Sequence, residues 1–135
     1  RTLLNFRSTS EAQTVGSIKI DNNSTTFATS SDYRLKEDIH PIADASERIQ
    51  ELQPCNFAWK SDGSRTDGFI AHELQAVVPE AASGTKDEVD AHGNPEYQGI
   101  DQSKLVPLLT AALQEALTKI DSLEARLDLI EGVPS

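Results

Sequence analysis

The sequence has one cysteine, Cys55, so no disulfide can form within the chain. No CxxC or Cys/His spacing of a zinc site accompanies it, and we expect Cys55 to be buried as a small apolar residue. Long apolar runs are also missing: none approaches the roughly 20 residues that a membrane helix needs. The sequence therefore predicts neither a disulfide scaffold nor a membrane helix.

Aromatic residues are scarce as well. They make up 5% of the 135 residues, and all apolar residues together make up 37%. Apolar burial has to offset the entropy lost when a chain becomes ordered. The apolar content is low for a domain of this length that folds alone, so we expect neighbouring chains to complete the core.

Basic residues are outnumbered: 12 Lys and Arg face 22 Asp and Glu, which gives a formal net charge of −10. Such a charge repels phosphates and argues against broad nucleic-acid binding. Of the three histidines, His40, His72 and His92, only His72 adjoins an acid, Glu73, and the second histidine of a zinc helix is missing. There is no Gly-rich phosphate loop either, so we expect no metal and no cofactor.

Residues 1–30 are rich in Ser, Thr and Asn. Within them, "GSIKI" and "TTFAT" alternate and favour strands, and "DNNS" between them is typical of a turn. The segment predicts a short hairpin or the end of a fibrous β region. It has too few apolar residues to fold alone.

Residues 31–100 predict a small α/β unit. In "PIADASERIQEL" the apolar residues have helical spacing, and Pro41 stands at a favourable early position. The further expected elements are a strand at 55–60, a loop, a strand at 68–71, a short helix from 72 that stops near Pro79, a polar loop at 82–96 and a short strand at 97–100.

Residues 103–131 carry an unbroken heptad pattern, which predicts a long helix. Pro107 has to lie in its first turn, and Gly132 and Pro134 end it. The apolar residues alternate in steps of three and four. They are Val106, Leu113, Ile120 and Leu127 at position a, and Leu109, Ala116, Leu123 and Ile130 at position d.

The charges beside this stripe favour association with a parallel copy. Lys119 at position g matches Glu124 at e, and Arg126 matches Glu131 in the same way. The alternative is that the stripe packs on the core of its own domain. We favour self-association because the stripe is narrow and the rest of the chain is short of core. The mixture of residues at a and d does not decide between a dimer and a trimer.

The stretch "SSDYRLKEDIHPI" from Ser30 to Ile42 is the one candidate for chemistry. A serine hydroxyl becomes a nucleophile when a base takes its proton, and a desolvated lysine can be that base. Ser31 and Lys36 would diverge on a straight strand and can meet only if the chain turns or across a subunit boundary. The simpler alternative is that Ser31 or Asp32 caps a helical turn with a solvated charged face.

Five stretches carry a resemblance to a known family. They are "SDYRLKEDIHPI", "LQPCNFAWK", "GFIAHELQAVVPE", "IDQSKLVPLLTAALQE" and "KIDSLEARL". The chain resembles the C-terminal intramolecular chaperone and self-cleaving domain of bacteriophage tailspikes, tail fibres and neck appendages. Phage endosialidases are members, and a similar domain occurs in myelin regulatory factors. The resemblance covers residues 31–135, and residues 1–30 look like the end of a fibre stalk.

The resemblance implies an α+β fold whose long C-terminal helix, at 103–131, forms a parallel coiled coil in a homotrimer. It implies a domain that trimerises and folds the upstream fibre and then releases itself as a single-turnover serine endopeptidase. By motif, Ser31 is the nucleophile, Lys36 the general base, and the cut falls at the Ser30–Ser31 bond. Ser30 is also a hydroxyl and stays an alternative nucleophile.

The same resemblance implies the partners and the location. The partners are two further copies of the chain and the fibre that it folds, without nucleic acid or membrane. Assembly takes place in the host bacterial cytoplasm, after which the stalk stays in the virion tail and the chaperone part is released. The first residue, Arg1, also leads us to expect a piece of a longer chain.

One residue departs from the family pattern: His72 stands where members usually carry Gln. We expect a structural role for His72 and for Glu73. The competing functions are a non-catalytic trimerisation tip that stays on the fibre and a receptor-binding tip, for which the sequence offers no specific support.

Overall fold

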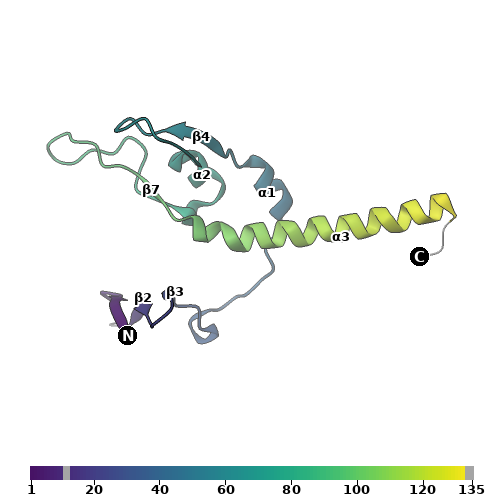
Figure 1. Cartoon of the computed structure of the whole chain (residues 1–135), viewed down its shortest axis with the longest axis horizontal. Helices are drawn as coiled ribbons and strands as arrows, with labels where there is room; N and C mark the ends of the chain where they lie inside the picture. The colour runs from purple at the N-terminus through teal and green to yellow at the C-terminus, as the bar shows by residue number, and fades with distance from the viewer. Residues whose placement is uncertain (11–12, 133–135) are drawn as a thin grey trace. The chain divides into compact units, whose positions relative to one another are not determined.

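The computed structural model describes residues 1–10 and 13–132. The chain divides into two compact units, Arg1–Pro41 and Ile42–Ser135, and each is described by itself. Figure 1 shows the strands of the first unit and the helices and short strands of the second. The predicted boundary between residues 30 and 31 stays a prediction. Pro134, expected to end the last helix, lies outside the described residues.

The first unit is a three-stranded antiparallel sheet followed by a short turn. Its strands are β1 (Thr2–Arg7), β2 (Thr14–Ile20) and β3 (Thr25–Thr29), in the order β1-β2-β3. The predicted hairpin is therefore confirmed as β2 and β3. Its turn forms because the Asp21 carboxylate accepts hydrogen bonds from the backbone N–H groups of Asn23 and Ser24. The first strand, β1, was not anticipated from the sequence.

This sheet has almost no core of its own. Among residues 1, 3–10 and 13–41, whose exposure is described, Ser17 is the one that is buried. Large apolar side chains such as Leu4, Phe6 and Phe27 are exposed, Phe27 to 76%. A small sheet without a covered apolar face is only marginally stable in water.

The second unit combines helices with two small antiparallel sheets, β4-β5 and β6-β7, so the predicted α+β class is confirmed. Its elements are α1 (Ala45–Glu51), β4 (Cys55–Ala58), β5 (Arg65–Gly68), α2 (Ala71–Val77), η2 (Pro79–Ala81), β6 (Ala82–Ser83), β7 (Gly99–Ile100), η3 (Gln102–Leu105) and α3 (Val106–Glu131).

Two predicted boundaries are wrong. The first helix begins at Ala45 and leaves Pro41 and Ile42 outside, because Asp44 before it adopts a left-handed conformation with φ of 54°. The second strand is Arg65–Gly68, not 68–71. A tight turn, in which the Trp59 N–H binds the Ser64 carbonyl, brings the polar residues after it directly into the ladder.

The core of the second unit lies where its helices meet. α1 packs against α3, and α2 with η2 closes the remaining side. The buried apolar residues are Ala45, Leu74, Val78, Ala81, Leu105 and Leu108. Partly buried side chains, including Ile49, Leu52 and Phe69, surround them.

The long helix α3 has two different apolar sides. Leu108, Ala111 and Ala112 belong to the core or pack against it, at heptad positions c, f and g. The a and d residues stay exposed, and the larger ones keep between 49% and 81% of their surface. The stripe therefore does not pack on the core of its own domain. Figure 1 shows α3 extending well past the rest of its unit.

The N-terminus of α1 is capped from α3. Glu115 accepts a hydrogen bond from the Ser46 N–H at 3.0 Å and a second from the Ser46 hydroxyl. These bonds hold the pKa of the Glu115 carboxyl below its usual 4.5, and the bond from the Ser46 hydroxyl has the largest effect. A carboxylate at a helix N-terminus also interacts favourably with the helix dipole. Glu115 thus helps to fix α1 on α3.

We predict that Glu115→Gln lowers the thermal unfolding midpoint by a few degrees at pH 7, measured by circular dichroism. Since the folded-state pKa of Glu115 is depressed, its contribution is present above pH 4.5 and is lost as the pH falls through the folded value. The difference from wild type should therefore shrink in acid. Asp121→Asn, which removes a carboxylate from an exposed position of the same helix, is the control. Equal losses in both variants would contradict the capping role.

Candidate active site

The candidate site begins where the chain leaves the sheet. Directly after β3, Ser30 is still bound to β2: its N–H donates to the Val15 carbonyl at 3.0 Å. The Ser30 hydroxyl donates to the Thr14 carbonyl at 2.9 Å. The next residue, Ser31, is the first to turn away from the sheet. The proposed scissile bond, between Ser30 and Ser31, lies at this departure point.

A single turn of 3-10 helix, η1 (Tyr33–Leu35), follows at once. The Asp32 carboxylate caps it by accepting a hydrogen bond from the Arg34 N–H at 2.9 Å. The Leu35 N–H binds the Asp32 carbonyl, and the Lys36 N–H binds the Tyr33 carbonyl, each at 3.1 Å. This turn supplies the chain reversal that the Ser–Lys spacing requires.

The turn brings the two predicted catalytic residues together. The Lys36 Nζ donates a hydrogen bond to the Ser31 Oγ at 2.7 Å. From the sequence, capping and a Ser–Lys contact were alternatives, and the structure contains both, with Asp32 as the cap. Ser30, the alternative nucleophile, directs its hydroxyl to the sheet instead.

Both Ser31 and Lys36 are exposed in the single chain. An ammonium group in water keeps its proton and can only donate to the serine. The neutral amine, in contrast, can accept the hydroxyl proton across the same short distance. The Lys36 Nζ and the Ser31 Oγ therefore lie within hydrogen-bond distance of each other at a position that is open to solvent in one chain.

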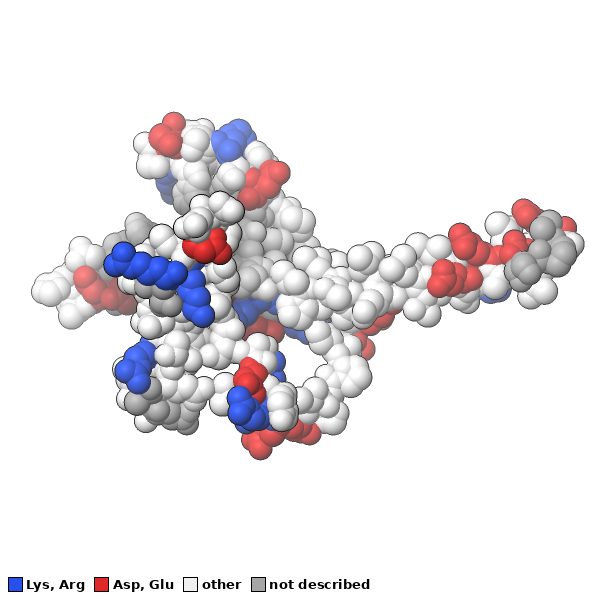
Figure 2. Space-filling view, turned by 60° about the horizontal axis from the view of Figure 1, so that its bottom comes forward, with Lys and Arg blue, Asp and Glu red and all other residues white. Residues whose placement is uncertain are grey.

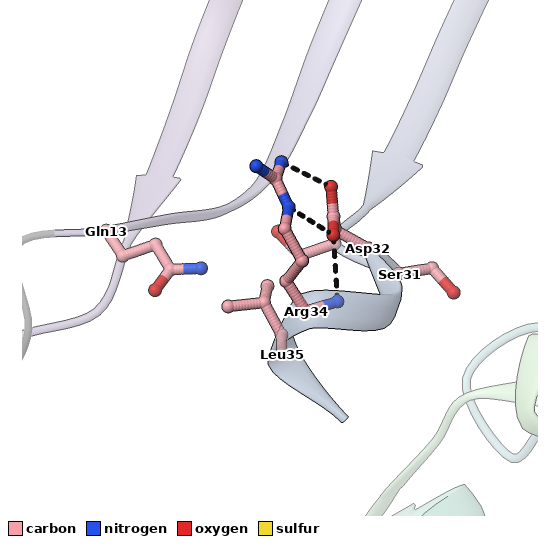
Figure 3. Close-up of a pocket in the computed structure, with 6 residues that line it drawn as sticks. Gln13, Ser31, Asp32, Arg34 and Leu35 are labelled. Atoms are coloured by element: carbon pink, nitrogen blue, oxygen red, sulfur yellow. Dashed lines mark hydrogen bonds and ion pairs between the residues drawn. The ribbon is translucent and has the colours of Figure 1, made fainter. Parts of the chain in front are cut away.

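An ion pair stabilises the outer side of the turn. The Arg34 guanidinium donates to Asp32 through Nε at 2.9 Å and through Nη2 at 2.8 Å. These bonds hold the pKa of Asp32 below its usual 3.8, and the bond from the Arg34 N–H lowers it further by a smaller amount. Figure 3 shows the pair and the Ser31 side chain, which points away from it. The pair thus holds the turn without occupying the hydroxyl.

A hollow of about 450 Å³ adjoins the turn. Its lining is Gln13, Ser30, Ser31, Asp32, Arg34 and Leu35. Gln13 was missed by sequence reasoning because it directly precedes β2 and comes near the turn only through the pairing of β2 with β3. Figure 3 shows Gln13 on its own side of the hollow, across from the turn.

The other residues singled out in the sequence have different surroundings, each described within its own unit. His40 contacts Asp38 at 2.7 Å, and the His92 N–H binds Asp90. His72, at the start of α2, lines a separate hollow in the second unit. Cys55 is half-buried rather than fully buried.

A wide apolar groove lies on the second unit. Phe57 and Trp59 meet edge to face there, with ring centroids 5.0 Å apart, as expected for two residues on one face of a strand. Phe69, Ile70 and Tyr97 line it further. Within residues 1–10 and 13–132 no cluster of three metal-ligating side chains occurs. The described helices include none long and apolar enough to cross a membrane.

Residues 31–83 match the family Peptidase_S74, described as the chaperone of endosialidase. The resemblance expected from the sequence is thereby confirmed, and the matched segment starts at Ser31 and includes Lys36. A solved structure titled "Crystal structure of a novel intramolecular chaperon" is also similar, at 20% identity and a TM-score of 0.46. That similarity covers 66% of this chain and 99% of the other.

We predict that Arg34→Gln raises the pKa of Asp32 toward 3.8, because the largest cause of its depression is the Arg34 side chain. Carboxyl-carbon NMR titration measures this. Asp21, whose pKa is lowered by bonds to Asn23 and Ser24, is an internal control and should not move. Because the Asp32 pKa is depressed, its contribution to the turn is present above 3.8 and is lost in acid. An Asp32 that titrates identically in both proteins would contradict the ion pair.

Proposed function

We propose that this chain is an intramolecular chaperone that trimerises and folds a phage tail fibre or spike and then releases itself by one cut at the Ser30–Ser31 bond. The observation that carries the proposal is the 2.7 Å contact between Lys36 Nζ and Ser31 Oγ. The contact lies inside the segment that matches the self-processing chaperone family.

The chemistry follows from this pair. Neutral Lys36 accepts the hydroxyl proton while the Ser31 Oγ attacks the carbonyl carbon of Ser30. The carbon–nitrogen bond breaks, Lys36 returns the proton to the Ser31 nitrogen, and an ester joins Ser30 to the Ser31 oxygen. Water then hydrolyses the ester, which leaves a carboxyl group on Ser30 and restores the Ser31 hydroxyl. One peptide bond and one water are consumed.

Assembly would control the timing of this reaction. Lys36 is exposed in one chain. Desolvation disfavours the charged form of a lysine. If neighbouring copies cover the turn in the trimer, Lys36 becomes able to act as a base only after assembly. Cleavage then reports that the fibre has been built.

The surface of α3 supports association. Leu108, Ala111 and Ala112, at positions c, f and g, hold the first turns of α3 to its own domain, and the a and d stripe stays exposed along the helix. Figure 2 shows uncharged side chains beside acidic ones along the arm that α3 forms. In a parallel coiled coil, Lys119 and Arg126 at position g face Glu124 and Glu131 at position e of the next copy. The trimeric state itself is taken from the family.

The cut also has a physical purpose. While the bond is intact, chaperone and fibre share one chain, so assembly of one raises the local concentration for the other. After the cut this link is lost, and the folded fibre is kinetically trapped. The chaperone part would be released in the host bacterial cytoplasm, and the stalk would remain in the virion tail.

The second candidate is a non-catalytic trimerisation tip that stays on the fibre. The exposed a and d stripe would serve it equally well. The Ser31–Lys36 contact favours the self-processing chaperone, because a structural tip has no need of an amine next to a hydroxyl.

We predict that the wild-type chain yields a fragment starting at Ser31, whereas Ser31→Ala stays whole. Lys36→Arg should also stay whole, because a guanidinium keeps the positive charge and cannot act as a base. Lys104→Arg, the same exchange in η3, is the matched control and should cleave normally. Intact-mass spectrometry of fresh and aged samples distinguishes these outcomes. A wild type that remains whole as a stable trimer would favour the structural tip.

We predict that Ile120→Asp, which places a charge in the a and d stripe, abolishes trimers and with them cleavage. Ala125→Asp makes the same kind of change at position f, outside the stripe, and should preserve both. Sedimentation measures the assembly, and intact mass measures the cut. A monomeric Ile120→Asp chain that cleaves at the wild-type rate would show that assembly is not required.

A further inference from the structure

The two sides of the proposed scissile bond are held by different parts of the first unit. On the amine side, η1 and the Lys36 hydrogen bond hold Ser31. On the acyl side, Ser30 is held by β2 alone, through the Val15 and Thr14 carbonyls. The bond is therefore placed by two structures that form independently.

The acyl side continues the strand ladder. β2 and β3 pair in register up to Gly16 opposite Thr29. The bond from the Ser30 N–H to the Val15 carbonyl adds one more step, and the hydroxyl bond to Thr14 reaches the first residue of β2. If β2 is not paired with β3, these two anchors of Ser30 are lost together.

The amine side does not have this dependence. The turn closes through bonds between residues 32 and 36, and Ser31 meets Lys36 five residues along the chain. Such short-range contacts can form before the sheet does. Nucleophile and base can then be adjacent while the carbonyl that they must attack is still free to rotate.

The sheet that anchors Ser30 has almost no core of its own in one chain. Its large apolar side chains, such as Leu3, Phe6 and Phe27, are exposed. Its stability thus depends on cover from outside the single chain, which assembled copies of a stalk would provide. Anchoring the scissile bond to this sheet makes the position of the carbonyl depend on the folding of the stalk.

We infer that Ser30 is a positioning residue for self-cleavage: its hydroxyl, bound to the Thr14 carbonyl, ties the scissile peptide to β2 and delays the cut until the β1-β2-β3 sheet has formed. The inference rests on the proposed function and extends it. Trimerisation through α3 would activate Lys36, and the folded stalk sheet would place the carbonyl. A chain with an assembled α3 and an unfolded stalk would stay whole.

The test follows cleavage of residues 1–135 over time after cell-free synthesis, with intact mass for the cut site and sedimentation for assembly. Ser30→Ala should slow cleavage by about tenfold or more, since small misplacements of reacting groups have effects of that size. The cut should stay before residue 31 and trimers should form normally. Ser30→Thr, which keeps the hydroxyl, should restore most of the rate.

Ser24→Ala is the matched control. It removes another serine hydroxyl from the same hairpin, one that binds Asp21 at the far end from the scissile bond. It should cleave at nearly the wild-type rate. Equal slowing by Ser24→Ala and Ser30→Ala would overturn the inference, because the effect would then be a general loss of sheet stability.

Gly16→Ala tests the sheet from a second position. An added Cβ would lie 3.0 Å from the Ala28 carbonyl oxygen, so the pairing of β2 with β3 has to shift next to Ser30. This variant changes no atom of Ser30, Ser31 or Lys36. It should slow cleavage while sedimentation still shows trimers. Wild-type rates in both Gly16→Ala and Ser30→Ala would overturn the inference.

The outcomes separate this inference from the proposed function. A cleaving wild type, a whole Ser31→Ala and a fast Ser30→Ala would retain the function and reject the role of Ser30. If Ser30→Ala stays whole while Ser31→Ala is still cut, and the cut falls before residue 30, Ser30 is the nucleophile. This result would reject both the proposed function of Ser31 and the positioning role of Ser30. A wild type that never cleaves would also reject both.

Discussion

A single chain leaves most of its large apolar side chains in contact with water, and this constraint shapes every part of the molecule. Among the described residues of the second unit, six make up its buried apolar core. The sheet of the first unit buries almost nothing, and the a and d residues of α3 are exposed along its length. Because burial of apolar surface is the main favourable term in folding, the proposed association would add stability that the single chain lacks.

Besides its small core, the chain uses polar contacts at the ends of its helices and turns. Glu115 caps α1 from α3, Asp32 caps the turn before Lys36, and Asp21 closes the β2–β3 turn. Each contact satisfies backbone N–H groups that would otherwise lack a partner at the start of a helix or turn. All three carboxyl groups have depressed pKa values: the largest cause is the Ser46 side chain for Glu115, the Arg34 side chain for Asp32 and the Asn23 backbone N–H for Asp21.

The candidate site combines local and non-local order. The Ser31–Lys36 contact needs one turn of helix and no core, whereas the position of Ser30 needs a paired sheet. A self-cleaving chaperone benefits from this division. A reaction that depended on local order alone would start before the fibre is finished, and the chaperone would be lost too early.

The sequence by itself determined the long helix, the β2–β3 hairpin, the α2 helix and the two residues of the candidate dyad. Heptad spacing, a turn motif and the "SDYRLK" stretch are local signals, and such signals can be read from the sequence before the fold is known. The start of α1 at Ala45 and the position of β5 were decided by the left-handed Asp44 and by the tight turn after Trp59. Only the tertiary structure decided which side of α3 covers its own domain, that Glu115 caps α1, and that Ser30 is tied to Thr14. These contacts join residues 16 to 69 positions apart, and their pairing depends on how elements pack rather than on any short stretch of sequence.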